Sequence, residues 1–272
     1  MKILISGGNG NIGSYLTKDL SSEHEIYSFT KADFDVCNKD IIHNIISKIE
    51  PDMVIHCAAI TDIDYCEFNQ CVAYSTNTIG SLNIASICSK FDIPLLYLSS
   101  NYVYGNYKSN PYIESDQCSP INIYGKTKLE GENLIRTLCN KFFILRTSWV
   151  IGGNNCPIKR ILKNSSSIVL CSEEITNITY IKDLSEFIKL IIKTDNYGIY
   201  NLCNKGFTSK YDIVNSLIKN LEYNKKTIKI PGDYITSAAP RPSFSAINCD
   251  TLEKTFNINI PSWEDSIIDY LK

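Results

Sequence analysis

A tyrosine, a lysine and a serine of this chain could together deliver a proton to a carbonyl oxygen. Tyr124 and Lys128 stand four residues apart in the run YGKTK, so on a helix they would share one face. A free phenol has a pKa of about 10, and a neighbouring cation stabilises the phenolate and lowers that pKa. Ser100 follows an apolar run and could hydrogen-bond the same oxygen. We therefore expect an oxyanion-type site for ketone reduction, with Tyr124 as proton donor.

Each of these three residues also has a purely structural interpretation. Tyr124 could be an aromatic residue at a helix start, Lys128 a solvated charge, and Ser100 an N-cap. The chemical interpretation is favoured because a second motif, near the start of the chain, predicts a bound dinucleotide.

That motif is the glycine-rich turn GGNGNIG at residues 7–13. It follows an apolar run and precedes an amphipathic one, which is the strand–turn–helix context of a dinucleotide site. Glycines such as Gly7, Gly10 and Gly13 let backbone N–H groups approach a pyrophosphate, and the positive end of the next helix adds favourable electrostatics. Their spacing is typical of short-chain reductases. The alternative is a strand–helix turn with no ligand.

The end of the second predicted strand bears on the choice between NADH and NADPH. An acidic residue there would bind the ribose diol of NADH and repel a 2′-phosphate, and none occurs before Asp33. Ser28, Thr30 and Lys31 could instead accept the phosphate, although Lys31 could also be a solvated loop charge. NADPH is therefore favoured, and NADH stays open.

Two further segments are expected beside the cofactor. Asp35-Val36 would lie against the adenine. Ala58-Ala59-Ile60 would lie beneath the cofactor, where a small residue lets it pack.

Short β-branched runs alternate with longer amphipathic ones, which is typical of a parallel sheet with crossover helices. The pattern predicts an α/β fold, a Rossmann-type doubly wound parallel sheet with a smaller C-terminal substrate lobe. We expect strands at residues 2–6, 25–29, 53–57, 95–99, 142–147 and 198–202, and helices at 12–20, 39–49, 66–90, 123–139 and 181–193.

The expected domain division follows from this pattern. Residues 1–150 and about 178–203 would form the NAD(P)-binding domain, and about 151–177 and 204–272 the substrate-binding lobe. Such a lobe would cover the carboxyl ends of the strands, where open α/β sheets bind ligands.

The composition favours a soluble globular protein of a reducing compartment. The net charge of −2 and the pI of about 6.0 give no indication of nucleic acid or an anionic membrane as partner. The 11 cysteines show no C-x-x-C pair and no zinc spacing with the histidines, so buried thiols are expected. No signal peptide or membrane-spanning run is found, and we expect a cytoplasmic protein.

The chain resembles the dTDP-4-dehydrorhamnose reductase family of extended short-chain dehydrogenases over nearly its whole length. The resemblance lies in residues 2–13, 35–36, 51–55, 58–61, 64–67, 99–104, 111–114, 120–132, 145–150 and 241–242. It implies NADPH-dependent reduction of the C4 ketone of a nucleotide-activated 4-keto-6-deoxyhexose, in nucleotide-sugar and surface polysaccharide biosynthesis.

The resemblance also implies roles for individual residues. Ser100, Tyr124 and Lys128 match the family's catalytic Ser/Thr, Tyr and Lys. Tyr124 and Lys128 are also expected to contact the cofactor, where the Lys128 ammonium could hold the nicotinamide ribose hydroxyls. The matching cofactor contacts are Gly10, Asn11, Ile12, Asp35, Val36, Ala58, Ala59 and Ile60. Ser100, Asn101 and Trp149 match sugar contacts, with a core Trp as the alternative. Arg241 would lie near the nucleotide diphosphate, with a surface loop as the alternative.

The chain departs from the family's pattern at the expected sugar site. The family usually has Asp where this chain has Asn101, and Gly and Pro where it has Thr176 and Ile178. Both changes bear on substrate identity. Some relatives bind magnesium through acidic residues, and Glu173-Glu174 could serve, but we expect a solvated acidic pair and no metal ligand.

Two other functions stay open. A nucleotide-sugar epimerase or dehydratase could use the same fold, but such an epimerase recycles tightly held NAD, which the missing acid after the second strand disfavours. A non-catalytic regulatory subunit resembling that of methionine adenosyltransferase would be free to lose Ser100, Tyr124 or Lys128, and all are present. The oligomeric state is open, with a homodimer as one alternative.

Overall fold

The computed structural model describes residues 1–154, 156, 167–220, 226–231 and 237–271. Its centre is a parallel six-stranded sheet in the order β10-β5-β4-β3-β1-β2. The strands are β1 (Lys2–Ser6), β2 (Glu25–Phe29), β3 (Met53–His56), β4 (Leu95–Ser100), β5 (Phe142–Thr147) and β10 (Gly198–Leu202). The predicted doubly wound fold is confirmed.

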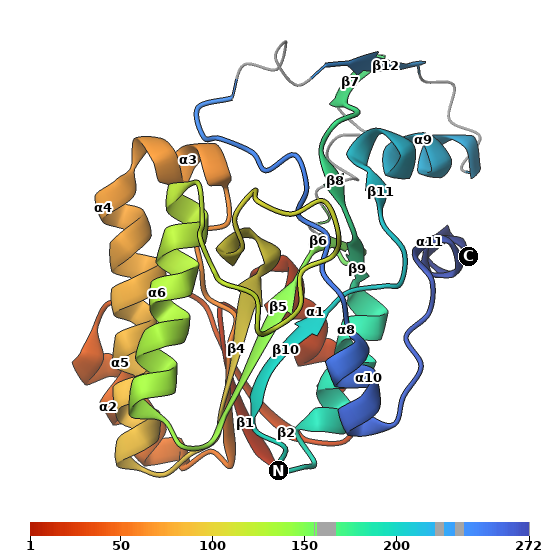
Figure 1. The fold of residues 1–272 in the computed structure, drawn as a ribbon. Helices are drawn as coiled ribbons and strands as arrows, with labels where there is room; N and C mark the ends of the chain where they lie inside the picture. Colours follow the sequence, from red (N-terminus) through yellow and green to blue (C-terminus); the bar gives the residue numbers. More distant parts are fainter. Residues whose placement is uncertain (155, 157–166, 221–225, 232–236, 272) are drawn as a thin grey trace.

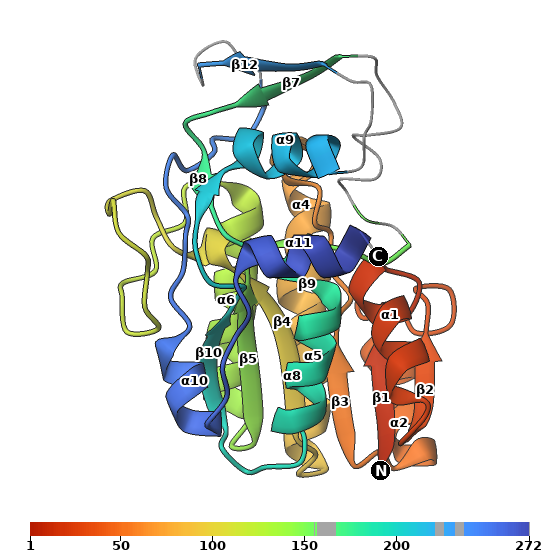
Figure 2. The same ribbon diagram turned by 90° about the vertical axis from the view of Figure 1, so that its right-hand side faces the viewer.

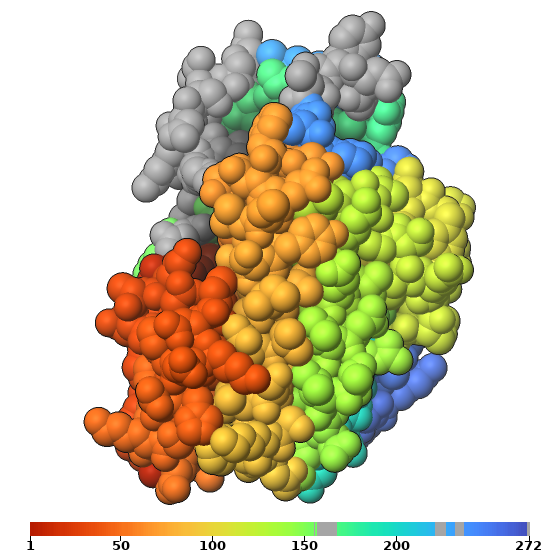
Figure 3. All heavy atoms as spheres, turned by 90° about the vertical axis from the view of Figure 1, so that its left-hand side faces the viewer, coloured from red at the N-terminus to blue at the C-terminus, as the bar shows by residue number. Residues whose placement is uncertain are grey.

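Helices cover both faces of this sheet (Figure 1). On one face lie α1 (Asn11–Leu20), α8 (Ile181–Ile191) and α10 (Asp250–Phe256). On the other face lie α2 (Lys39–Ile49), α5 (Gly80–Lys90) and α6 (Ile123–Leu138), which the space-filling view of Figure 3 shows side by side. Neighbouring strand residues pack into opposite layers, as Ile3 and Leu4 do. Burial of both faces explains the nearly continuous apolar strands.

The single helix expected over residues 66–90 was wrong. This stretch contains α3 (Ile63–Phe68), α4 (Gln70–Ala73), the π-helix η1 (Tyr74–Ile79) and then α5. The break falls at Asn69, whose backbone is not helical and whose side-chain amide donates to the Tyr65 carbonyl at 3.0 Å. Asn77 in η1 instead donates to the hydroxyl of Thr127 on α6 at 3.0 Å. Asn77 is also hydrogen-bonded to the backbone of Ile60, so this segment connects the loop after β3 to α6.

A smaller lobe lies over the carboxyl ends of the strands (Figures 1 and 2). The described residues of this lobe form three strand pairs and two helices. The pairs are β6 (Trp149–Ile151) with β9 (Ile178–Tyr180), β7 (Ser167–Cys171) with β12 (Lys226–Ile230), and β8 (Ile175–Thr176) with β11 (Thr208–Ser209); the helices are α9 (Lys210–Asn220) and α11 (Trp263–Leu271).

Leu252 of α10 packs into the core of the sheet, although α10 falls inside the segment assigned to the lobe. We propose the domain division expected from the sequence, with one change: α10 belongs to the NAD(P)-binding domain and not to the substrate-binding lobe.

The cysteines form no disulfide. All 11 are free, and seven are buried as expected, whereas Cys37 and Cys71 are exposed. Within the described ranges, every helix is too short or too polar to cross a membrane.

Candidate active site

The glycine-rich turn joins β1 to α1 with its backbone exposed to a ligand. Gly7 has a φ of 72°, and a Cβ atom there would lie 2.7 Å from the backbone nitrogen of Ala58. A Cβ atom on Gly13 would lie 2.3 Å from the Gly7 carbonyl oxygen. Gly10 is the N-cap of α1 and makes no side-chain capping bond. These features fit a dinucleotide pyrophosphate.

A cavity of about 190 Å³ opens beside this turn. Its lining includes eight of the predicted cofactor residues: Gly7, Gly10, Lys31, Asp35, Val36, Ala58, Ala59 and Ile60. The remaining predicted contacts, Asn11, Ile12, Gly13, Thr30, Tyr124 and Lys128, are not among the residues that line it.

Sequence reasoning missed four residues of this lining: Asn9, Phe34, Cys57 and Thr76. The first three adjoin predicted contacts and could have been found by extending each motif by one residue. Thr76 lies on the π-helix, and nothing in its sequence context signalled it.

The end of β2 is only partly free to receive a 2′-phosphate. Thr30 donates to the Asp33 carboxylate at 2.9 Å, and Ser28 accepts a bond from Thr17 at 2.7 Å. Lys31 is exposed and lines the cavity. Lys31 is therefore the stronger candidate for a phosphate contact.

Ser100, Tyr124 and Lys128 come together at the junction of β4 and α6. Ser100 ends β4, and its hydroxyl is hydrogen-bonded to that of Tyr124. All three residues are buried. The Asn122 side chain caps α6 by accepting from the Gly125 N–H at 2.9 Å. Gly125 is required because a Cβ there would lie 2.2 Å from the Tyr102 carbonyl oxygen.

The expectation that the pKa of Tyr124 lies below that of a free phenol was wrong. Burial raises the pKa of Tyr124 to about 12, and the bond to Ser100 opposes this only in part. Burial also lowers the pKa of Lys128 to about 7, although the charge of Glu132 opposes it. Removal from water disfavours each charged form, so Tyr124 keeps its proton at neutral pH. This state suits a proton donor.

A buried ion pair holds α6 against the sheet one turn after Lys128. The Arg146 guanidinium contacts the Glu132 carboxylate at 2.7 Å, and Ser99 donates to the same carboxylate. Arg146 lies on β5 and Ser99 on β4, so Glu132 fixes the catalytic helix to two central strands.

The predicted sugar contacts lie at the edge of the lobe. Trp149 begins β6, is half-buried, and packs against the apolar cluster of the lobe. Asn101 is buried, and its side-chain amide is hydrogen-bonded to Ser100, Ser148, Thr176 and Ser245.

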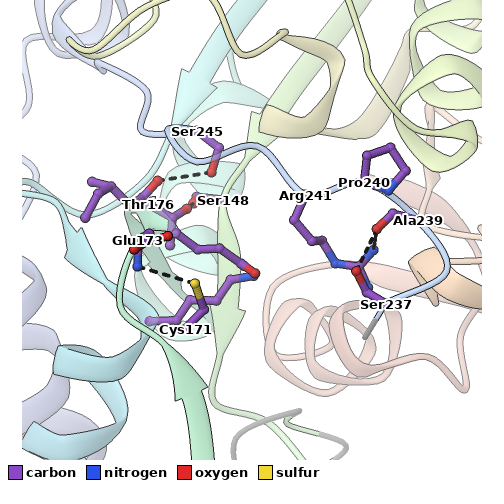
Figure 4. A network of polar contacts seen from close by, with 12 residues as sticks. Ser148, Cys171, Glu173, Thr176, Ser237, Ala239, Pro240, Arg241 and Ser245 are labelled. Atoms are coloured by element: carbon purple, nitrogen blue, oxygen red, sulfur yellow. Dashed lines mark hydrogen bonds and ion pairs between the residues drawn. The ribbon is translucent and has the colours of Figure 1, made fainter. Parts of the chain in front are cut away.

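Arg241 lies on a loop that contacts the catalytic helix. Its guanidinium contacts the Asp64 carboxylate at 2.8 Å and the Ala239 carbonyl at 3.0 Å, and the Asn122 amide donates to the adjacent Pro240 carbonyl. Figure 4 shows Arg241 on one side and Ser148, Thr176 and Ser245 on the other. The Asp64 partner could not be foreseen, because 177 residues separate the two in sequence.

The acidic pair Glu173-Glu174 is divided. Glu174 forms an ion pair with Lys210 of α9, whose environment also includes Tyr102 and Arg241. Across the residues that the structure describes, no cluster of three or more His, Cys, Asp or Glu is placed to hold a metal ion.

A larger hollow of about 400 Å³ lies along α6, next to Leu129, Asn133 and Arg136. None of the predicted site residues lines it, and the Arg146 guanidinium that reaches it is already paired with Glu132. We therefore propose that the active site lies at the glycine-rich turn and the β4–α6 junction.

The chain is similar to known proteins over nearly its whole length. The family model described as RmlD substrate binding domain matches residues 1–272. A dTDP-4-dehydrorhamnose reductase of Aggregatibacter actinomycetemcomitans is 31% identical, with 98% of this chain and 97% of the relative covered. The spore coat polysaccharide biosynthesis protein SpsK of Bacillus subtilis (strain 168) is 28% identical, with 100% and 97% covered.

Among solved structures, dTDP-4-dehydrorhamnose reductase from Bacillus anthracis in complex with NADP superposes with a TM-score of 0.95. It is 31% identical, and the match covers 99% of this chain and 98% of that one.

Proposed function

This chain belongs to the RmlD substrate-binding domain family, and on that premise we propose that it is an NADPH-dependent reductase. Its substrate would be a nucleotide-activated 4-keto-6-deoxyhexose, reduced at C4. The observation that carries the proposal is the junction of β4 and α6, where Ser100, Tyr124 and Lys128 are buried together. The glycine-rich turn at the same edge of the sheet supports a dinucleotide beside them.

In this proposal each residue of the junction has one task. The bound nicotinamide supplies the hydride. Tyr124, which is protonated at neutral pH, gives its proton to the oxygen on C4, and the transfer is favourable because an alkoxide is a stronger base than a phenolate. Ser100 hydrogen-bonds that oxygen, and the Lys128 ammonium stabilises the phenolate left behind.

The cofactor residues proposed are those of the turn and the cavity. The B. anthracis neighbour was solved with NADP, which supports NADPH here. Lys31 at the cavity supports the same choice, while Asp33 beside Thr30 opposes it in part. NADPH is therefore proposed over NADH, and no metal requirement is proposed.

The substrate class rests on the relatives' names and on the edge of the lobe. Trp149 is half-buried, so a face of its indole could pack on the apolar face of a deoxysugar. Arg241 is proposed to reach the diphosphate by exchanging Asp64 for phosphate oxygens, a geometry that a guanidinium favours. The product would serve surface polysaccharide synthesis, in line with the name of the B. subtilis relative.

We also propose a cytoplasmic location, because the substrate and NADPH are charged biosynthetic metabolites. A homodimer is the oligomeric state we would test first, by light scattering coupled to gel filtration.

The test is a spectrophotometric assay with purified protein, NADPH and a panel of 4-keto-6-deoxy nucleotide sugars carrying dTDP or UDP. We expect loss of nicotinamide absorbance with at least one ketosugar and a smaller rate with NADH. No turnover across the panel, while a control reductase consumes the same substrates, would contradict the proposal. NAD retained through purification would instead indicate an epimerase.

A further inference from the structure

The side-chain amide of Asn101 connects three distant segments of the chain. Its nitrogen Nδ2 lies 2.8 Å from the Ser245 carbonyl oxygen, 3.3 Å from the Ser148 Oγ and 3.4 Å from the Thr176 Oγ1. Figure 4 shows these three partner residues grouped together. Asn101 itself follows directly after Ser100 and is 3% exposed. One buried amide therefore bonds the end of β4 to both lobe strand β8 and the returning segment at Ser245.

The partners of Asn101 require a donor at this position. The Ser245 carbonyl can only accept. The Ser148 hydroxyl donates its one proton to the Asn177 carbonyl at 2.7 Å, and it lies 3.0 Å from the Thr176 hydroxyl, which can donate to it. With those protons committed, both hydroxyls present lone pairs to Asn101. An ionised Asp at position 101 would place a carboxylate oxygen, which can only accept, against the Ser245 carbonyl and the two hydroxyl oxygens, which also act as acceptors here.

The other atom of the same amide contacts the proposed catalytic serine. Ser100 donates to the Asn101 oxygen Oδ1 at 3.3 Å. This bond is long, so the serine proton can turn to a substrate oxygen at small cost. The amide group thus contacts Ser100 with its oxygen and the lobe with its nitrogen.

We propose that Asn101 is a positioning residue and not a sugar ligand. Its side chain holds the lobe segments that carry the proposed sugar contacts in place beside Ser100. This inference rests on the proposed function only in taking the pocket to be one for a sugar. Ser148 precedes Trp149, and Ser245 stands four residues after Arg241, so the amide fixes both segments that carry the proposed substrate contacts.

The test compares Asn101→Asp with a matched control, Ser245→Ala. The control removes a side chain of the same network but keeps the backbone carbonyl that Asn101 uses, and its hydroxyl makes only a 3.4 Å contact with the Ile175 carbonyl. Thermal melting of the ligand-free proteins is followed from pH 5.5 to 8.5, together with NADPH affinity and kcat/KM for the ketosugar.

We expect Asn101→Asp to melt below the natural protein by a margin that widens as pH rises. The new carboxyl would be buried among acceptors, which raises its pKa above the unfolded value of about 3.9. Its protonated form can donate to the Ser245 carbonyl, so stability is retained at low pH and lost as pH rises through the folded pKa. Ser245→Ala should show a small margin that does not change with pH.

At pH 8 the kcat/KM of Asn101→Asp for the ketosugar should fall about tenfold or more, since a buried acceptor loses its donor. NADPH affinity should be unchanged. A melting margin that is absent or independent of pH overturns the proposal, as does a loss confined to substrate KM with normal melting, which is the result for a direct sugar ligand. Absence of turnover in the natural protein contradicts the proposed function alone, because the melting test needs no substrate.

Discussion

The ammonium nitrogen of Lys128 lies 3.9 Å from the centroid of the Tyr97 ring. Tyr97 belongs to β4 and is fully buried, so the ring forms the floor beneath this lysine. An aromatic face attracts a cation by its quadrupole, most strongly when both are removed from water. The charge of Glu132 also favours the Lys128 ammonium, although Glu132 is paired with Arg146. The Tyr97 ring therefore adds to the stabilisation of the charged form of Lys128.

Replacing Tyr97 by Leu should move the high-pH limb of kcat to lower pH. Lys128 has a pKa of about 7, and because it is proposed to work as a cation, activity should fall as pH rises through that pKa. Loss of the ring lowers the pKa further, by about half to one and a half pH units. Glu132, Cys57, His56 and Tyr124 also face this region and are unchanged by the substitution. A pH profile of kcat measures the shift.

Tyr97→Phe is the matched variant, because it keeps the aromatic face and removes only the hydroxyl. The high-pH limb of its kcat profile should lie at the same pH as in the natural protein. Equal shifts in both variants would contradict a role for the ring.

Tyr124→Phe should remove most turnover and leave the cofactor site intact. Loss of the proton donor is expected to lower kcat by about 10²–10⁴-fold. NADPH titration by fluorescence should give the affinity of the natural protein. Tyr102, whose ring lies 6.0 Å from that of Tyr124, provides the control, and Tyr102→Phe should keep most activity. Comparable losses in both would argue against Tyr124 as the donor.

Lys31→Ala should weaken NADPH more than NADH. Lys31 lines the dinucleotide cavity, and a charge-assisted bond to a 2′-phosphate would be worth about tenfold in KM at an exposed site. The measured quantity is the ratio of kcat/KM for the two cofactors. Lys39→Ala at the start of α2 is the control, because Lys39 is also exposed but is not among the residues that line the cavity. A ratio that is unchanged in Lys31→Ala would rule out the contact.

Glu132→Gln should destabilise the fold far more than loss of an exposed ion pair. The change leaves the buried Arg146 guanidinium without its counter-charge, which costs about 3–5 kcal/mol. Urea unfolding gives the free energy of unfolding. Asp92→Asn removes the partner of Lys141 in an exposed pair and should cost less than about 1 kcal/mol. Asn is also tolerated at the positive φ of 55° found there, so backbone strain adds nothing. Similar losses in the two variants would contradict a special role for the buried pair.

The sheet could be predicted from the sequence because a strand that is buried on both faces has a recognisable local pattern of apolar residues. Each strand of the sheet is a short apolar run between amphipathic ones, and α2 was predicted to the residue at 39–49. The glycine-rich turn and the YGKTK run are equally local, which is why the β4–α6 junction could be expected from the sequence alone.

What could not be predicted depends on distant partners. The pKa of Tyr124 depends on how much of the protein surrounds it, and no spacing reports that. Asn101 matched a family sugar contact, yet its amide bonds to protein groups far away in the sequence. Arg241 likewise meets Asp64, which lies 177 residues away. The break at Asn69 reflects competition between a side-chain amide and the helix backbone, which residue periodicity does not reveal.

The hydrogen bonds of Asn101 also determine how late in synthesis the site can be completed. Its partners Ser148, Thr176 and Ser245 lie 47, 75 and 144 residues downstream. During synthesis, Asn101 leaves the ribosome long before Ser245, whose carbonyl accepts a hydrogen bond from the Asn101 amide. A nascent chain can form much of the nucleotide-binding half while translation continues, but the pocket beside Ser100 closes only when the last tenth of the polypeptide emerges. Premature termination in that stretch would therefore yield a chain with much of its sheet and no finished catalytic centre.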